Sequence, residues 1–279
     1  MEIRIAEYAG FCYGVKKAID DTEEILKTEG PSKALGALIH NPLEVDRLKK
    51  LGLQVIDTAA EAEGERVIIR SHGEAKQVIE QLETSKNTVF NCTCPYVSKI
   101  HRIVSDYYAK KYGIIIIGDS THPEVIGING WCDNSATIID TVDAARLLEI
   151  DGPTCIVGQT TFNTELWENM INILRSKSEQ VVVFNTICDA TAKRQQAARE
   201  LASQADCMIV VGGKNSSNSK KLYEICRSIC AATYFVESAD ELSYEEFAGD
   251  VVIGITAGAS TPDWVIQEII NKFRRRGNC

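Results

Sequence analysis

TVFNCTCPYVSKIHRIVSDYYAKKYGIIIIGDSTHPEV, residues 88–125, contains every part of the pattern that decides the fold of this chain. An apolar strand leads to Cys94, and a helix with apolar residues at helical spacing follows. A second apolar strand, GIIIIGD at 113–119, then leads to a polar loop that contains His122. Strands that alternate with helices in this way are typical of a parallel α/β sheet.

The same pattern occurs three times in the chain. EIRIAEYAGFC leads to Cys12 and a helix, and VVVFNTIC leads to Cys188 and another helix. A polar loop residue follows each cysteine after 28 residues, in the pairs Cys12 and His40, Cys94 and His122, and Cys188 and Ser216. Equal offsets in three places indicate an internal repeat, with periods of 82 and 94 residues, which is the size of a small domain.

Two further strands complete each repeat, and the last of them always ends in a polar loop. These loops are Ser71-His72-Gly73, Gln159-Thr160-Thr161 and Ala259-Ser260-Thr261. Ligands of parallel α/β sheets bind beyond the carboxyl ends of the strands, which is where all of these loops fall. The sequence therefore predicts three similar small parallel-sheet α/β domains in a pseudo-threefold arrangement around one centre.

The predicted boundaries follow the cysteines. Repeat 1 covers residues 1–94, repeat 2 covers 95–184 and is led by Cys94, repeat 3 covers 185–264, and a C-terminal helix and tail cover 265–279. The composition, with 44% hydrophobic and 25% charged residues, is an ordinary globular one and is compatible with several buried cores.

The charge pattern excludes several classes of partner. The formal net charge is -9 and there is no long basic stretch, so a nucleic-acid partner is not expected. The first residues lack the basic and then apolar regions of a secretory leader, and no apolar run approaches the ~20 residues that span a bilayer. We expect a cytoplasmic monomer that does not bind a membrane.

Ten cysteines in a reducing compartment are expected to be free thiols, metal ligands or catalytic groups. Three of them occupy equivalent places, and three thiolates around one centre suit a soft metal. Zinc remains an alternative, although structural zinc sites normally take four ligands. An iron–sulfur cluster also usually takes four cysteines, so a cubane held by three would leave one iron open to a substrate oxygen.

The other cysteines are expected to pack as small hydrophobic side chains. They are Cys92, Cys132, Cys155, Cys207, Cys226 and Cys230, besides the terminal Cys279. Cys92 lies so close to Cys94 that the sequence alone leaves open which of the two thiols is the ligand. Cys94 fits better, because it precedes a proline in Thr-Cys-Pro.

Three of the four histidines, His40, His72 and His122, fall in the polar loops, and an imidazole can donate hydrogen bonds to phosphate oxygens. His101 lies on a helix and is expected to be structural. Glu124 follows His122 by two residues. If it is buried, it could retain a proton and serve as an acid.

Two loops are rich in small donors. GGKNSSNS at 212–219 follows a strand and leads into a helix, where backbone N–H groups attract anions, and AGAST at 257–261 is built similarly. Ordinary helix caps are the alternative interpretation of each loop. Neither loop contains a P-loop or a dinucleotide-binding motif.

These residues together resemble the IspH family, also called LytB. The matching motifs run from residue 10 to residue 263 and are GFCYGV, IHN, SHG, TCP, HPEV, QTT, ICDAT with KRQ, GGKNSSNS and TAGASTPD. The resemblance implies an enzyme that reduces 4-hydroxy-3-methylbut-2-enyl diphosphate to isopentenyl and dimethylallyl diphosphate, the last step of the methylerythritol phosphate route. The reaction would consume two electrons and release water.

The resemblance also implies the site. One central [4Fe-4S] cluster per chain would be held by Cys12, Cys94 and Cys188, with the substrate hydroxyl on the fourth iron. The substrate-binding residues implied by matched motifs are His40, His72, His122, Thr160, Ser216, Ser217, Asn218 and Ser260. His122 and Thr160 would also act in catalysis beside Glu124, the expected proton donor. Because no nucleotide motif is present, the electrons would come from an external carrier such as ferredoxin or flavodoxin.

Two other classes remain open from the residues alone. A non-catalytic iron–sulfur sensor or electron carrier would not need three loop histidines and a serine-rich anion loop. A cluster-free phosphate-binding protein would not need three equivalent cysteines.

Overall fold

Runs of branched apolar residues form the central strands. In the computed structural model, Gly113–Ile117 forms strand β6. Side chains alternate across a strand, so Ile114 and Ile116 enter one hydrophobic core while Ile115 and Ile117 enter another. Both faces of the strand are therefore buried, which explains why its sequence is continuously apolar.

The structure describes residues 1–243, 247 and 251–276. Residues 277–279 of the predicted tail, including Cys279, lie outside the described residues. Within the described part of the chain, the helices are α1 (Tyr13–Thr28), α2 (Pro42–Lys50), α3 (Lys76–Thr84), α4 (Pro95–Ala109), α5 (Pro123–Asn129), α6 (Val142–Leu147), α7 (Thr164–Lys177), α8 (Asp189–Ala202), α9 (Ser217–Ile229) and α10 (Asp263–Arg276). Short 3-10 turns are η1 (Ala59–Glu61), η2 (Gly130–Cys132) and η3 (Ala239–Glu241).

The described strands form three four-stranded sheets, and every pairing is parallel. The first has the order β3 (Leu53–Ile56), β2 (Ser32–Leu35), β4 (Arg66–Ile69), β5 (Thr88–Asn91). The second has the order β7 (Thr137–Ile139), β6, β8 (Thr154–Gly158), β9 (Val181–Val183). The third has the order β11 (Thr233–Val236), β10 (Cys207–Val211), β12 (Val252–Ala257), β1 (Glu2–Ile5).

The three sheets share one strand order, which confirms the predicted repeat of parallel α/β units. The strand before each cysteine completes the sheet of the preceding repeat: β5 pairs with β4, and β9 pairs with β8. The first strand of the chain, β1, follows the same rule and pairs with β12. Residues 1–94 thus supply the whole first sheet and also the edge strand of the third, which residues 185–264 lack. The repeat boundaries at 94, 184 and 264 remain a prediction.

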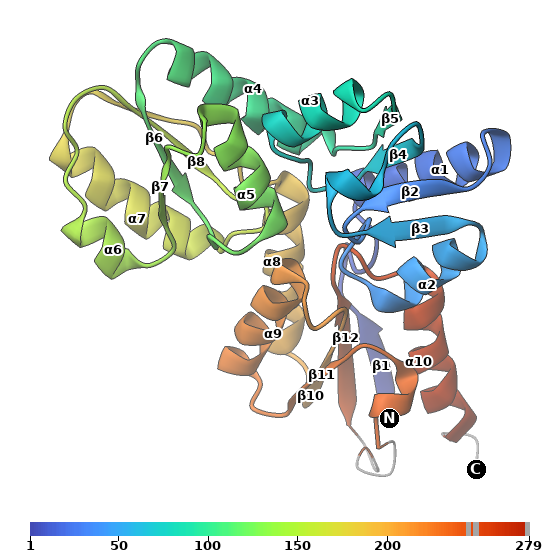
Figure 1. Cartoon of the computed structure of the whole chain (residues 1–279). Coiled ribbons are helices and arrows are strands. Elements are labelled where there is room, and N and C mark those ends of the chain that lie inside the picture. Colours follow the sequence, from blue (N-terminus) through green and yellow to red (C-terminus); the bar gives the residue numbers. More distant parts are fainter. Residues whose placement is uncertain (244–246, 248–250, 277–279) are drawn as a thin grey trace. The chain divides into compact units, whose positions relative to one another are not determined.

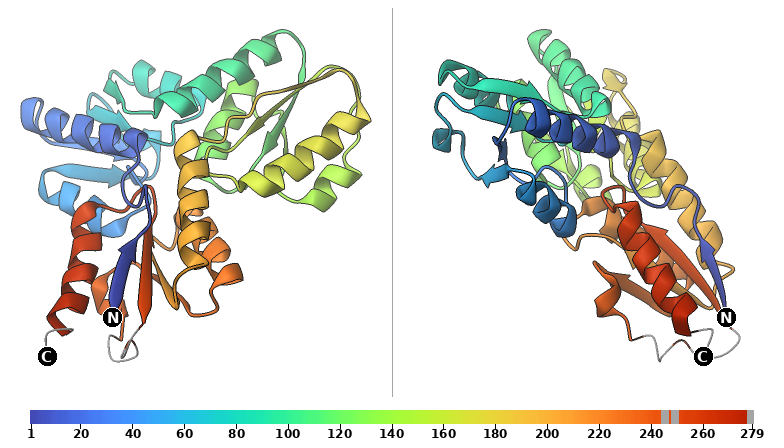
Figure 2. Two further views of the ribbon diagram at one scale, coloured as in Figure 1. Left: turned by 180° about the vertical axis from the view of Figure 1, so that it is seen from behind. Right: turned by 90° about the vertical axis from the view of Figure 1, so that its right-hand side faces the viewer.

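Helices cover both faces of the third sheet. In Figure 1, α10 lies on one side of β12 and β1, and α8 and α9 lie on the other. Figure 2 shows the same order from behind. Apolar side chains of α10 such as Ile269 and Phe273 pack with Ile253 and Ile255, whereas α8 and α9 pack on Met208 and its neighbours. Each face of this sheet thus has its own buried core.

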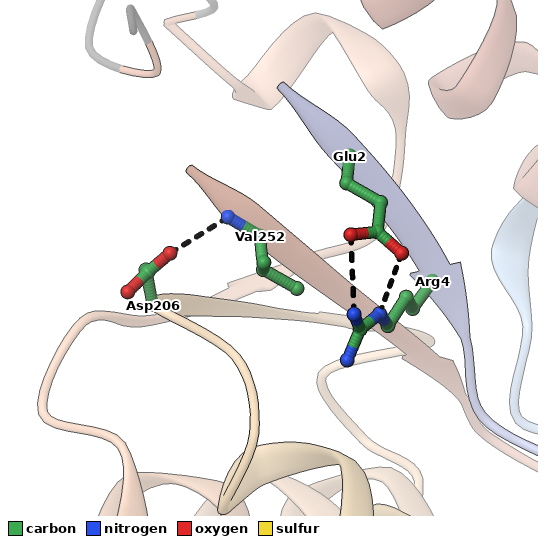
Figure 3. Close-up of polar contacts among 4 residues, drawn as sticks. All are labelled: Glu2, Arg4, Asp206 and Val252. Atoms are coloured by element: carbon green, nitrogen blue, oxygen red, sulfur yellow. Dashed lines mark hydrogen bonds and ion pairs between the residues drawn. The ribbon is translucent and has the colours of Figure 1, made fainter. Parts of the chain in front are cut away.

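Strand β1 is an edge strand, and it carries charge. Arg4 donates two hydrogen bonds to the carboxylate of Glu2, at 2.8 and 3.1 Å (Figure 3). On the neighbouring strand, the N–H of Val252 donates to Asp206 at 2.7 Å. Charged side chains on an edge strand discourage pairing with a second molecule.

The chain divides into two compact units. The first unit comprises Met1–Lys16, Ile39–Asp46 and Asp189–Cys279, and contains the third sheet. The second comprises Lys17–Leu38 and Arg47–Cys188, and contains the other two sheets. No helix among the described residues is long and apolar enough to cross a membrane.

Candidate active site

The three repeat cysteines are built into the fold in the same way. Cys12, Cys94 and Cys188 each stand directly before a helix, namely α1, α4 and α8. The backbone N–H of each donates to a carbonyl two residues beyond the end of the last strand of a repeat, in the pairs Cys12 to Ala259 (3.1 Å), Cys94 to Ser71 (3.0 Å) and Cys188 to Thr160 (3.0 Å). All three thiols are partly exposed and can reach a ligand.

The other described cysteines differ from these three. Cys92, Cys132, Cys155, Cys207, Cys226 and Cys230 are all buried. Burial raises the pKa of Cys92 and Cys207 to about 11 and that of Cys155 and Cys226 to about 12. Such thiols stay protonated, so they behave as the packing residues that the sequence predicted. This contrast favours Cys94 over Cys92 as a ligand.

The polar residues found by equal spacing also occupy equivalent places. His40, His122 and Ser216 each lie five residues beyond the end of a strand, after Leu35, Ile117 and Val211 respectively. His122 and Ser216 cap the following helices, because His122 Nδ1 accepts from Glu124 N (3.1 Å) and Ser216 Oγ accepts from Ser219 N (3.3 Å). The neutral His122 ring therefore carries its proton on Nε2, where it can donate to a ligand.

Asn41 performs the same capping function for α2, accepting from Glu44 N at 3.0 Å. No separate role was predicted for this residue from the sequence. The sequence does contain the pattern of a helix start here, since asparagine followed by a proline, Pro42, commonly begins a helix. His40 is thereby left outside the helix and next to the cap.

Three loops converge within the first unit. Ser260 Oγ donates to the carbonyl of His40 at 3.2 Å. Gly213 lies against the same carbonyl so closely that a side chain at this position would overlap it. The loops at 40, 212–219 and 257–261 thus meet around one backbone group, although they come from different repeats. This arrangement brings His40, Ser216, Asn218 and Ser260 to one end of the unit.

Asn218 is the most informative residue of this group. It is 3% exposed, and both polar atoms of its amide are buried without a hydrogen-bond partner among the described residues. Burying an unpaired amide costs free energy, so such groups are rare in native proteins unless they serve a ligand. Ser217, the first residue of α9, precedes it and is partly exposed.

Two glycines allow these loops to pack. A methyl group on Gly258 or on Gly212 would overlap the hydroxyl of Ser219, which is fully buried in α9. We expect Gly258→Ala to lower the free energy of unfolding by about 1–3 kcal/mol, the usual cost of overpacking. Ser219→Gly in the same chain should restore part of it. Thermal unfolding measures both effects, and a double variant no more stable than Gly258→Ala would contradict this packing.

The second unit holds the remaining site residues. The rings of His72 and His122 meet edge to face, with centroids 5.6 Å apart. They come from the first and second sheets, so loops of two repeats also meet here. Cys94 and Cys188 belong to the same unit.

Glu124 is 2% exposed, and its carboxyl group accepts hydrogen bonds from Thr160. Its two carboxyl oxygens contact Thr160, whose backbone N–H donates at 2.6 Å and whose hydroxyl donates at 2.7 Å. Burial raises the pKa of Glu124 from its ordinary value of 4.5 to about 7, against the opposing effect of these hydrogen bonds. The carboxyl group can therefore hold a proton near neutral pH. The carbonyl of Thr160 also accepts from Cys188 N, which links this acid to a cysteine position.

The structure thus gathers the predicted residues into two sets. The first unit contains Cys12, His40, Ser216, Ser217, Asn218 and Ser260, and the second contains His72, Cys94, His122, Glu124, Thr160 and Cys188. Among the described residues, no three His, Cys, Asp or Glu side chains form a group that could hold a metal ion. The donor set itself fits a soft metal, since three accessible thiols stand at equivalent helix starts.

Comparisons with known proteins agree with this construction. A family model described as LytB protein matches residues 3–274. The 4-hydroxy-3-methylbut-2-enyl diphosphate reductase of Caldanaerobacter subterraneus subsp. tengcongensis is 47% identical, over 98% of this chain and 97% of the relative. The protein of the same name from Clostridioides difficile is 46% identical, over 97% of this chain and 98% of the relative.

Two solved structures share the fold. The E-1-hydroxy-2-methyl-but-2-enyl-4-diphosphate reductase of Plasmodium falciparum superposes with a TM-score of 0.92 at 28% identity, over 97% of this chain and 87% of the other. A second structure, of (E)-4-hydroxy-3-methyl-but-2-enyl diphosphate reductase, gives 0.72 at 40% identity, over 99% and 100% of the two chains. The chain belongs to the LytB family, whose members use an iron–sulfur cluster.

Proposed function

We infer that the chain is a 4-hydroxy-3-methylbut-2-enyl diphosphate reductase, which catalyses the terminal step of the non-mevalonate route to isoprenoids. The reaction removes the hydroxyl group of the allylic diphosphate with two electrons and yields isopentenyl and dimethylallyl diphosphate. The family and the names of its relatives support this activity. The observation that carries the assignment of the site is the identical construction of the three cysteine positions.

The proposed cofactor is one [4Fe-4S] cluster per chain, held by Cys12, Cys94 and Cys188, with the fourth iron open to the substrate. When bound, the cluster supplies electrons to the allylic system and a Lewis acid for its oxygen. The chain's own contribution is to present three thiolates at helix N-termini, each fixed by a backbone hydrogen bond. Electrons would enter from an external carrier such as ferredoxin or flavodoxin, and the enzyme would act as a monomer.

The diphosphate is assigned to the donors of the converging loops. In the first unit, His40, Ser216, Ser217, Asn218 and Ser260 supply imidazole, hydroxyl and amide groups, and the N-terminus of α9 adds backbone N–H groups. His72 of the second unit adds another imidazole. A diphosphate needs several donors, and hydrogen bonds to charged groups contribute roughly 1.5–3 kcal/mol each. The buried, unpaired amide of Asn218 supports this assignment most directly.

The group that donates the proton for the reaction is assigned to the second unit. Cleavage of the carbon–oxygen bond requires a proton for the departing hydroxide, and the product requires one on carbon. Glu124 holds a proton near neutral pH, and the Thr160 hydroxyl bonded to it can relay that proton. His122 Nε2 can hold the substrate oxygen in place.

Anaerobic purification tests the proposal as a whole. A brown protein with about four iron and four sulfide per chain, the content of a cubane cluster, is expected. Turnover of the allylic diphosphate with a strong chemical reductant should follow. A colourless protein that binds the diphosphate would be a cluster-free binding protein instead. A brown protein without turnover would be a sensor or an electron carrier.

Asn218→Leu should separate binding from stability. The substitution removes an amide that has no partner among the described residues, at the same approximate size. We expect substrate affinity to fall about tenfold or more, while the unliganded protein unfolds at the same temperature or higher, because an unpaired buried amide costs about 1–3 kcal/mol. Calorimetric titration and thermal unfolding measure the two effects. Normal affinity in this variant would remove Asn218 from the site.

A further inference from the structure

The loop that carries His72 rests on a second histidine. His101 lies on α4, two helical turns beyond Cys94, and is 4% exposed. A methyl group on Gly73 would lie 2.5 Å from the Cε1 atom of His101, so the imidazole packs directly against the backbone after His72. Gly73 has a φ of +73°, which glycine adopts most easily. The backbone at Gly73 therefore has a conformation that favours glycine, and the His101 ring packs against it.

Trp131 completes the support. Its indole stacks on the His101 ring, with centroids 4.9 Å apart and planes 18° apart. The indole Nε1 donates to the carbonyl of Glu74 at 3.1 Å. The stacked pair thus contacts the backbone immediately after His72 in two places. His101 packs against Gly73, and Trp131 donates a hydrogen bond to the carbonyl of Glu74.

The same segment is held by helix α5. A methyl group on Gly127 would be 3.5 Å from the carbonyl of Gly73, and one on Gly130 would overlap Ala75. Helix α5 also carries Glu124, and His122 caps its start. The position of His72 relative to His122 therefore depends on the groups that pack against residues 73–75.

The His101 ring acts through its shape. Burial lowers the pKa of His101 to about 4, so the ring is neutral at physiological pH. Its Nε2 is buried without a hydrogen-bond partner among the described residues. A neutral imidazole whose Nε2 has no hydrogen-bond partner among the described residues packs chiefly as a flat surface of a given size, which a phenyl ring can also provide.

From these contacts we propose that His101, stacked on Trp131, is a positioning residue that holds His72 in register with His122 for binding the substrate's diphosphate. The proposal rests on the proposed function, because it assigns the consequence of the contact to His72. His101 does not touch the substrate. Replacing His101 by a smaller residue leaves a cavity next to Gly73, and the loop that carries His72 can then move into it.

The test compares His101→Ala with His101→Phe in the cluster-loaded enzyme. His101→Ala should raise KM roughly tenfold or more, since a small displacement of a binding group is costly, and should leave kcat within about threefold. His101→Phe should keep KM within about threefold of the wild type, because the volume and the stack are retained. The iron content of both variants should equal that of the wild type. If His101→Ala fails to fold, His101→Leu takes its place, because leucine also lacks a flat ring. His101→Leu should then raise KM, and His101→Phe should not.

Two controls separate positioning from a general loss of structure. Tyr107→Ala removes another packed ring from α4, one that contacts Tyr112 and Phe184, and should lower the unfolding temperature without changing KM. A double-variant cycle with His72→Ala should be strongly non-additive, because His101 acts through His72. Additive effects, an equal KM change in Tyr107→Ala, or a His101→Phe enzyme as weak as His101→Ala would each overturn the proposal. Wild-type enzyme that fails to turn over the allylic diphosphate would instead refute the proposed function.

Discussion

Replacing Cys12, Cys94 or Cys188 by serine is expected to abolish turnover and to release most of the bound iron. Serine keeps the size of the side chain but replaces a soft thiolate by a hard, weakly acidic hydroxyl, which is a poor ligand for iron in a sulfide cluster. A cluster held by only three cysteines has no spare ligand, so each loss should have nearly the full effect.

Cys92→Ser is the matched control, because it changes the same group two residues from Cys94. Cys92 is 6% exposed and burial raises its pKa to about 11, so it is not available as a thiolate. We expect this variant to keep its iron and most of its activity. Iron and sulfide analysis, the visible spectrum and turnover measure these effects. Loss of the cluster in Cys92→Ser together with its retention in Cys94→Ser would reverse the ligand assignment.

Glu124→Gln is expected to lower turnover roughly 100-fold or more while leaving the cluster and substrate binding in place, in the range of a positioned general acid. The amide is nearly isosteric with the carboxyl group. Its oxygen can still accept from the backbone N–H of Thr160, as Glu124 does at 2.6 Å. What it lacks is a transferable proton. A variant with near-normal turnover would end this role and direct attention to His122.

The pH dependence gives a second readout of Glu124. Because the acid form is required, the wild-type rate should fall as pH rises through about 7, its pKa in the folded protein. Between pH 4.5 and 7 the folded state keeps a proton that the unfolded chain has released, so this group makes the protein less stable as pH rises over that window. Glu124→Gln should remove both trends. Chemical denaturation at pH 5 and pH 8 measures the second one.

The sequence predicts most of the fold because its signals are local. Most strands contain a short apolar run, the helices α1, α4 and α8 each begin directly after a cysteine, and equal spacing identifies His40, His122 and Ser216 as equivalent. The structure places these three at the same distance from their strands. The burial of Glu124 could be suspected from its motif, but not its contact with Thr160, which lies 36 residues away.

What the sequence could not predict depends on contacts between distant segments. No local pattern in EIRI tells that β1 pairs with β12, 250 residues away, rather than with its own repeat. His101 looks like an ordinary helical residue, since nothing near it in the chain reveals Gly73 above its ring. The amide of Asn218 is recognisable as a polar group, but its lack of a partner is visible only once the surrounding loops are in place.

The pairing of β1 with β12 has a consequence for the order in which the protein is made. The sheet that ends with β5 can form when residue 91 has been synthesised, and the one that ends with β9 can form at residue 183. The third sheet must wait for β12, so the first strand off the ribosome is among the last to find its neighbour. Cys12 gains its backbone partner, Ala259, equally late. Under the proposed ligand assignment, iron loading at Cys12 therefore belongs to the finished chain. The charges of Glu2 and Arg4 disfavour pairing of the waiting strand elsewhere.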